Sequence, residues 1–271
     1  MDTIDISWPY LALGISIMLI PVAILYYYKT GMVKDTLIST GRMILQLLLV
    51  GFYLEFLFRL DLWWANVLWL LVMIIVAALT MINRTGLKMK IFIVPNIFAL
   101  VVTMIIVDAF FFLLVIQNDS IFEARYLIPI SGMILGNAMQ NSIISLNQFY
   151  SDIREHPGIY RFSLGNGATL NESLLDYFKK GMESSLNPSI AKMAVIGLIA
   201  LPGTMTGQII GGSNPVTAIK YQILLMIVIF AASALSSWLC LLVSQRAAFD
   251  KAGNLKQGIF KLKKSAVTKK Q

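Results

Sequence analysis

Residues 166–222 read NGATLNESLLDYFKKGMESSLNPSIAKMAVIGLIALPGTMTGQIIGGSNPVTAIKYQ. The segment begins polar and becomes an apolar run of membrane length, which Pro202 and Gly203 interrupt near its middle. Gly203, Gly207 and Gly211 recur every four residues, so they share one face of a helix. A face of small residues lets helices approach closely in a membrane. The stretch therefore predicts a polar element joined to a Gly-lined membrane helix, with the other helices around them.

The composition places the chain in a membrane. Of its 271 residues, 58% are hydrophobic and 13% are charged, and the mean hydropathy is +0.76. About a quarter of the residues in a soluble domain are charged. The net charge of +8 would suit a nucleic-acid-binding protein, but the basic residues lie beside apolar runs. We therefore expect an all-α polytopic membrane protein that contacts lipid and no nucleic acid.

Seven apolar stretches are long enough to cross a bilayer as helices, which takes about 20 residues each. They are residues 6–28, 37–58, 62–82, 91–117, 126–148, 189–211 and 218–244. The runs are too long and too uniformly apolar for the strands of a membrane barrel. About seven transmembrane helices are predicted.

The distribution of basic residues predicts the orientation. All Lys and Arg residues except Arg59, Arg125 and Lys220 lie in one set of alternate segments, and Lys192 is counted in that set. Basic loops stay in the cytosol, so the N-terminus is expected outside and the C-terminus inside. We expect one transmembrane domain over residues 1–248 and a basic cytosolic tail over 249–271. The tail is expected to be solvated and held near anionic lipid, with partner docking as the alternative.

Two acidic residues stand inside predicted spans. Asp108 is deep in the fourth span, where a polar group is costly and typically faces a cavity or the bundle interior. It is a candidate for a substrate or proton contact, and a hydrogen-bonded structural role is the alternative. Glu55 has Arg59 four residues later, which favours a local ion pair.

The fifth span carries a polar stripe. Asn137, Asn141, Ser145 and Gln148 fall mostly on one helical face. Such a stripe either bonds neighbouring helices or lines a water-accessible path. The candidates for the pathway or substrate are Asp108, Met133, Asn137, Met139, Gln140, Asn141, Thr204, Met205 and Gln208. The candidates for close helix packing are Gly132, Gly136, Pro202, Gly203, Gly207 and Gly211, and the glycines of the sixth span could instead allow the pathway to open.

The longest polar segment is residues 149–188, which we expect in the cytosol. Thr169 followed by Glu172 has the spacing of a capping box, which predicts the start of an amphipathic helix. This helix either lies on the membrane or docks in a groove of a cytosolic partner. Its candidate contact residues are Thr169, Leu170, Leu174, Leu175, Phe178 and Lys179.

Four motifs in order resemble one family. They are GMILGNAM (132–139), SLGNGAT (163–169), LPGTMTGQIIGG (201–212) and NPVTAIKYQI (214–223). Together they look like the FetB-type permeases, the membrane subunits of a bacterial ABC transporter linked to iron export, to which plant proteins of aluminium tolerance are similar. The resemblance implies that residues 168–181 form the coupling helix that fits into an ATPase subunit.

The expected function follows from that resemblance. It implies the permease subunit of an ATP-driven exporter of metal ions such as iron, in the inner membrane, as a homodimer with two separate ATPase subunits. No phosphate-binding loop GxxxxGK[ST] occurs in these residues, so ATP is expected to be used by the partner, and the chain itself is expected to bind no cofactor and to catalyse nothing. The metal ligands are unknown. The alternative is a gradient-driven carrier or channel with Asp108 and Glu55 as coupling acids.

Overall fold

The protein is all-helical. A computed structural model describes residues 7–60, 62–116, 123–199, 201–250, 253–256 and 258–261, and for residues 52, 54–60 and 116 it describes the backbone alone. No strand is present in these ranges. The expected placement of the N-terminus (residues 1–6) and of residues 262–271 falls outside the described residues, and so does any contact of the Glu55 and Arg59 side chains.

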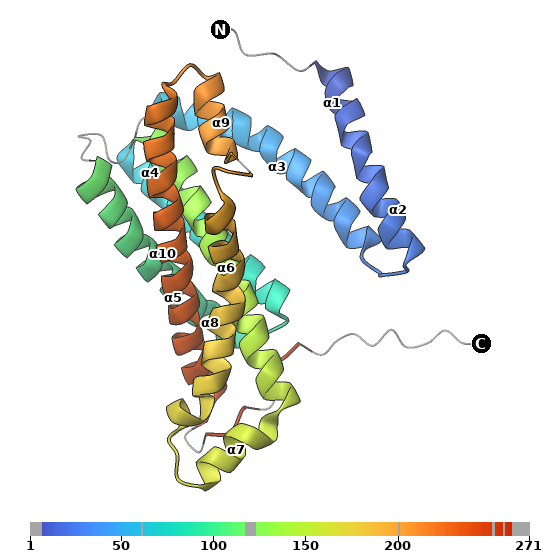
Figure 1. Ribbon diagram of the computed structural model, residues 1–271, viewed down its shortest axis with the longest axis vertical. Helices are drawn as coiled ribbons and strands as arrows, with labels where there is room; N and C mark the ends of the chain where they lie inside the picture. Colours follow the sequence, from blue (N-terminus) through green and yellow to red (C-terminus); the bar gives the residue numbers. More distant parts are fainter. Residues whose placement is uncertain are drawn as a thin grey trace.

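The helices follow one another along the chain with short connections (Figure 1). They are α1 (Trp8–Ile15), η1 (Ser16–Met18), α2 (Leu19–Tyr27), α3 (Val33–Leu60), α4 (Trp63–Thr85), α5 (Met89–Ala109), the π-helical η2 (Phe110–Ile116), α6 (Ala124–Glu155), α7 (Pro157–Gly165), α8 (Leu170–Val195), α9 (Gly203–Ile210) and α10 (Pro215–Ala248).

The all-α membrane class is confirmed. In the described ranges, four helical segments are long and apolar enough to cross a membrane: Trp8–Tyr27, Trp63–Thr85, Met89–Val115 and Pro215–Ala248. The other predicted spans coincide with α3, with α6 and its polar stripe, and with the interrupted pair α8 and α9. The count of seven and the orientation stay predictions, so the two ends of the bundle are called the α7 end and the α9 end.

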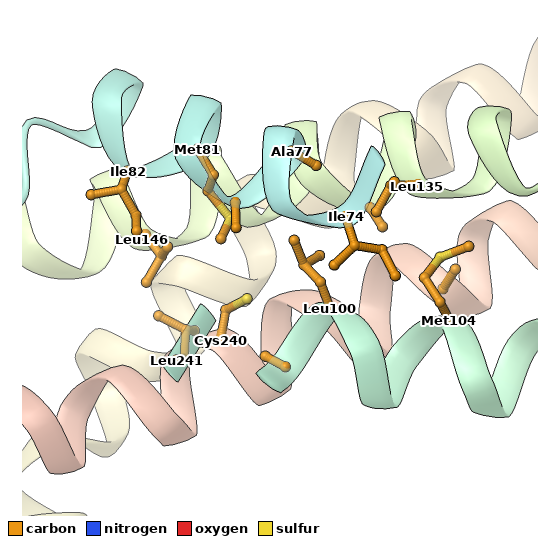
Figure 2. Close-up of a cluster of buried hydrophobic side chains, with 14 of the residues drawn as sticks. Ile74, Ala77, Met81, Ile82, Leu100, Met104, Leu135, Leu146, Cys240 and Leu241 are labelled. Carbon is orange, nitrogen blue, oxygen red and sulfur yellow. The ribbon is translucent and has the colours of Figure 1, made fainter. Parts of the chain in front are cut away.

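A bundle of α4, α5, α6, α8 and α10 contains the core. Figure 2 shows Met81 of α4, Leu100 of α5, Leu146 of α6 and Cys240 of α10 converging on one buried cluster. The α6–α10 contact is lined by serines: Ser236 Oγ lies 3.1 Å from Ser142 Oγ, and both side chains are fully buried. Small hydroxyl side chains suit this interface because they let two helices approach closely and form hydrogen bonds with each other inside a membrane.

The first three helices stand apart from the bundle (Figure 1). None of the residues of α1, η1 and α2 is buried. Among the α3 side chains that the structure describes, Tyr53 near the C-terminal end reaches the bundle, and its ring centroid lies 4.0 Å from that of Trp69 of α4. The apolar faces of these helices are therefore open to lipid or to another chain.

The start of the basic tail is folded onto the bundle, contrary to our expectation of a solvated tail. Residues 253–256 pair with Ala248 and Phe249 at the end of α10, and residues 258–261 return along the turn between α4 and α5. Lys88 N donates a hydrogen bond to Ile259 O at 2.7 Å, and Lys261 N donates to Gly86 O at 2.8 Å. Ile259 is fully buried. Because Ile259 lies in the core and Leu255 and Phe260 pack against it, this part of the tail is attached to the bundle.

Candidate functional site

The sixth span is broken beside a cavity. α8 ends at Val195, Gly197 takes a left-handed backbone conformation with φ of 89°, and α9 begins at Gly203. The predicted interruption at Pro202 and Gly203 is confirmed. A cavity of about 430 Å³ lies at the break between α6, α8, α9 and α10. Irregular backbone at membrane depth is tolerated where it is buried in protein or lines such a cavity.

The cavity has a mixed lining of amide, hydroxyl, thioether and ammonium groups. Its lining residues of these kinds are Met133, Asn137, Lys192, Thr204, Gln222 and Met226. Thr204 Oγ1 donates to Gln222 Oε1 at 2.6 Å, which ties the start of α9 to α10. Asn137 Nδ2 donates to Met133 O at 2.8 Å, so its Oδ1 is left to accept other donors. These groups can make several weak contacts to a passing solute.

Lys192 is the residue that sequence reasoning misplaced. We counted it with the cytosolic basic residues, but it lines the cavity together with Asn137, at the centre of the predicted span 126–148. The reason is that α8 starts as early as Leu170, so its last turns reach the level of the cavity. An ammonium group at that depth needs water or a partner. The sequence did indicate this position, because Lys192 lies inside the predicted sixth span, residues 189–211.

Exposed polar side chains occur on α6 and α8 between this cavity and the α7 end. They are Gln140 on α6 and Glu183, Asn187 and Lys192 on α8. Gln140 and Lys192 lie inside predicted spans, where a polar side chain cannot face hydrocarbon without a large free-energy cost. A second protein surface or a water-filled path is needed to cover these two.

The remaining pathway candidates are scattered. Asn141 is buried and donates to Ser189 Oγ at 3.3 Å, so it joins α6 to α8. Met139 packs against the core and Met205 is buried on α9, while Gln208 lies outside the cavity lining. Asp108 lines a different cavity, on the α4–α5 side. Among the described residues no group of three or more His, Cys, Asp and Glu side chains could hold a metal ion.

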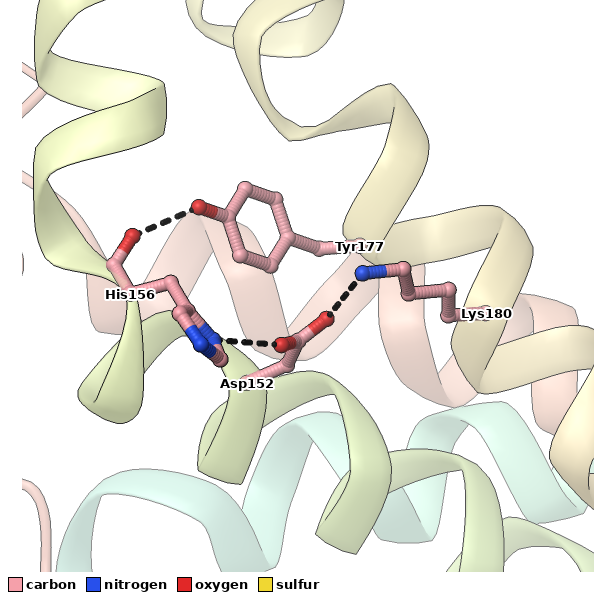
Figure 3. Close-up of polar contacts among 4 residues, drawn as sticks. All are labelled: Asp152, His156, Tyr177 and Lys180. Atoms are coloured by element: carbon pink, nitrogen blue, oxygen red, sulfur yellow. Dashed lines mark hydrogen bonds and ion pairs between the residues drawn. The ribbon is translucent and has the colours of Figure 1, made fainter.

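At the α7 end, a polar network fastens α6 and α7 to α8 (Figure 3). Asp152 Oδ2 accepts a hydrogen bond from Lys180 Nζ at 3.1 Å, and Asp152 Oδ1 lies 2.9 Å from His156 Nδ1. Tyr177 OH donates to His156 O at 2.7 Å. Because the carboxylate of Asp152 is nearly buried, it is a strong acceptor for both neighbours. The network fixes the corner at which the chain turns from α6 into α7.

α7 itself is the most exposed apolar element at this end. Ile159 and Phe162 are 60% and 74% exposed, whereas Tyr160 between them is buried. A groove of about 270 Å³ beside Ile159 is lined by Asp176, Lys179 and other charged residues of α8. An apolar ridge next to a charged groove has the composition of a protein-docking surface. Sequence reasoning missed this helix because it is only nine residues long.

The predicted coupling residues take up mixed positions. Thr169 caps α8 through the predicted capping box: Glu172 N donates to Thr169 Oγ1 at 3.3 Å, and Thr169 N donates to Glu172 Oε2 at 2.7 Å. Leu174 is only 1% exposed, so in this conformation it is a core residue and no partner can reach it. Leu170 and Phe178 pack partly against the same core, while Leu175 and Lys179 are exposed.

Most of the predicted packing glycines are open within the described chain. A Cβ added at Gly203, Gly207 or Gly136 would meet nothing within 4 Å in the described chain, so any close packing of the Gly face must involve another molecule. At Gly132 the nearest atom would be the flexible end of Met73. The close approach occurs instead at Gly181, where α8 crosses α6 and α10. Sequence reasoning missed Gly181 because a single glycine does not form a repeating pattern that would indicate close helix packing.

The cap of α8 predicts a pH dependence of stability. Hydrogen bonds from the hydroxyl and then the backbone of Thr169 lower the pKa of Glu172 below its ordinary value. A lowered pKa in the folded state stabilises the protein above the ordinary pKa of glutamate, about 4.3, and this is lost as the pH falls through the folded pKa. We expect Glu172→Gln to lower the melting temperature in detergent at pH 7 and to converge with the wild type in acid. A difference that stayed constant with pH would contradict this account.

Comparison with known proteins gives consistent matches along almost the whole chain. The profile described as "Uncharacterised protein family (UPF0014)" matches residues 8–249. A UPF0014 membrane protein of Synechocystis sp. is 33% identical over 237 residues, which are 88% of this chain and 90% of that protein. Protein ALUMINUM SENSITIVE 3 of Arabidopsis thaliana is 32% identical, covering 92% of this chain and 90% of its own. The probable iron export permease protein FetB of Escherichia coli is 29% identical, covering 92% and 95%. No solved structure matches the chain.

Proposed function

Because this chain belongs to the UPF0014 family of membrane proteins, we propose that it is the permease subunit of an ATP-driven exporter of metal ions such as iron. The resemblance drawn from its four motifs is confirmed by the family match. The metal substrate is proposed because one relative carries the name of a probable iron export permease. The chain would lie in the inner membrane with its α7 end in the cytosol.

The observation that carries the proposal is the continuity of α8. This one helix runs from the corner fastened by Asp152 to the break beside the cavity, over 26 residues or about 39 Å. A force applied to the first turns of α8, beside α7, therefore reaches the broken span along one continuous helix. An ATPase subunit that docks on Ile159 and Phe162 could change the shape of the cavity by this route, which is what an ATP-driven permease requires.

A second copy of the chain completes the pathway in this proposal. The exposed side chains of Gln140 and Lys192 lie within predicted spans that otherwise face hydrocarbon. If two copies bring these side chains together, they line a shared path and do not meet lipid. The weak contacts of the cavity suit transport, because a solute must be able to leave as well as enter.

The test is transport in proteoliposomes that hold this chain and the ATPase that co-purifies with it. We expect movement of ferrous iron that requires ATP and continues when ionophores collapse the proton and sodium gradients. Movement that persists without ATP and stops with the ionophores would instead identify a gradient-driven carrier. Asp108→Asn separates the two further, since it should abolish transport by a carrier that uses Asp108 and spare an ATP-driven one.

A further inference from the structure

A second cavity lies between α4, α5 and α6, apart from the cavity at the broken span. Its volume is about 340 Å³, within the range of small-molecule pockets. Its inner wall is made by large apolar side chains, Leu70, Ile74, Met104, Phe112 and Leu127. Asp108 is the one ionisable residue in this lining. The cavity therefore combines an apolar body with a single acidic group.

The cavity opens on a surface that faces lipid. Leu71, Ile105 and Leu113 are lining residues at 43%, 63% and 56% exposure, and all three belong to spans. Apolar side chains exposed on a membrane span contact hydrocarbon. A ligand would therefore enter from the bilayer, and its main part must be apolar.

Asp108 has an acceptor without a partner. Ser131 Oγ of α6 donates to Asp108 Oδ2 at 3.0 Å, and Oδ1 has no hydrogen-bond partner among the described residues. The residue is only 8% exposed. A buried carboxyl oxygen left without a partner costs free energy, and a membrane offers no water to supply one. The carboxyl can turn about its broad terminal torsion to present either oxygen.

The backbone near Asp108 is also irregular. α5 ends at Ala109, one residue later, and the chain continues as the π-helical η2. Wider π turns within α-helices are frequent at functional sites. Here the widened turn carries Phe112 and Leu113, which line the same cavity.

We propose that this cavity is a binding site for a membrane-dissolved amphiphile with an alkyl chain and an amine head group. The chain would lie among Leu70, Met104 and Phe112, and the ammonium would pair with Asp108. The geometry selects an amine because an ionised Asp108 carboxylate offers acceptors only, and the hydroxyl hydrogen of Ser131 is already donated to Oδ2. An anionic head group would be repelled. The site is independent of the proposed transport pathway.

The experiment compares two photoreactive probes of equal chain length, a diazirine-bearing dodecylamine and the corresponding dodecanol. The purified full-length protein is placed in nanodiscs of zwitterionic lipid, labelled, and mapped by mass spectrometry. We expect labelling of α4 and α5 around Ile74 and Met104, with the amine about tenfold more effective than the alcohol, as a charge-assisted hydrogen bond implies. Equal labelling by the two probes, or labelling mainly elsewhere, would overturn the proposal.

Two variants make the result specific. Asp108→Asn keeps an acceptor for Ser131 and should lower labelling by the amine to that by the alcohol. Val67→Trp places a larger side chain in the cavity and leaves Asp108 unchanged, so it should reduce labelling by both probes. If Asp108→Asn proved too unstable to purify, the filling variant alone would decide, since unchanged labelling of Val67→Trp would show that the probes bind outside the cavity.

Discussion

A leucine at position 181 is expected to prevent stable folding of the helical bundle. A Cβ at Gly181 would lie 3.1 Å from Ser145 O, 3.4 Å from Leu241 Cδ1 and 3.6 Å from Phe149 Cβ. The nearest of these atoms is a backbone carbonyl of α6, which cannot rotate away. Overpacking typically costs about 1–3 kcal/mol and occasionally more. Three helices meet at this point, so their separation would disturb the whole core.

The matched control is Gly207→Leu, where the described chain has no atom within 4 Å. We expect the control to elute as a monodisperse species and to melt near the wild-type temperature, and Gly181→Leu to aggregate or to melt far below it. Equal melting temperatures would contradict the tight crossing at Gly181. The control is informative in its own right: a folded Gly207→Leu protein with less dimer would place the Gly face of α9 against a second copy.

The second large effect is expected at α7. The double change Ile159→Glu with Phe162→Glu should leave the protein folded, because both side chains are exposed, and should abolish co-purification with the ATPase and ATP-driven export. Burying an apolar side chain of this size is worth about 1.5–3 kcal/mol. Losing two such contacts raises the Kd of the complex with the ATPase by about a hundredfold or more. Co-purification and export are measured together.

Two leucines of α8 provide the controls. Leu175→Glu changes an exposed residue on the helix that the sequence singled out, and it should retain the partner if α7 is the docking element. Leu174→Glu places a charge in the core and should lower the melting temperature before any partner is added. If the α7 double variant bound the ATPase normally and Leu175→Glu did not, α8 and not α7 would be the docking element.

The features predicted correctly from the sequence are those that short-range chemistry determines. Pro202 and Gly203 marked the break because proline at that point starts a new helix and does not continue the old one. Thr169 and Glu172 marked the start of α8 because a capping box needs only four residues. The membrane class followed from composition.

The features that were missed depend on the packing of distant segments. Gly181 is critical because of its contacts with α6 and α10, which no pattern around it reveals. Lys192 reaches the level of the cavity because the start of α8 determines how far its last turns extend. Ile259 is an apolar residue between lysines, and only the α4–α5 turn explains its burial. The candidate site was thus predicted in part, through Met133, Asn137 and Thr204, and completed by Lys192 and Gln222.

The crossing at Gly181 gives α8 the properties of a lever with a fulcrum. The helix extends about 17 Å from Gly181 to Leu170 and about 21 Å from Gly181 to Val195, so its two arms are nearly equal. A tilt of about 5° would move the two ends by roughly 1.5–2 Å in opposite directions. A push on the α7 end of a straight, rigid α8 would therefore move its cavity end in the opposite direction and by a slightly larger distance, because the second arm is the longer one. Pro188 lies on that arm and removes one backbone hydrogen bond, so bending at this point would reduce the movement that reaches the broken span.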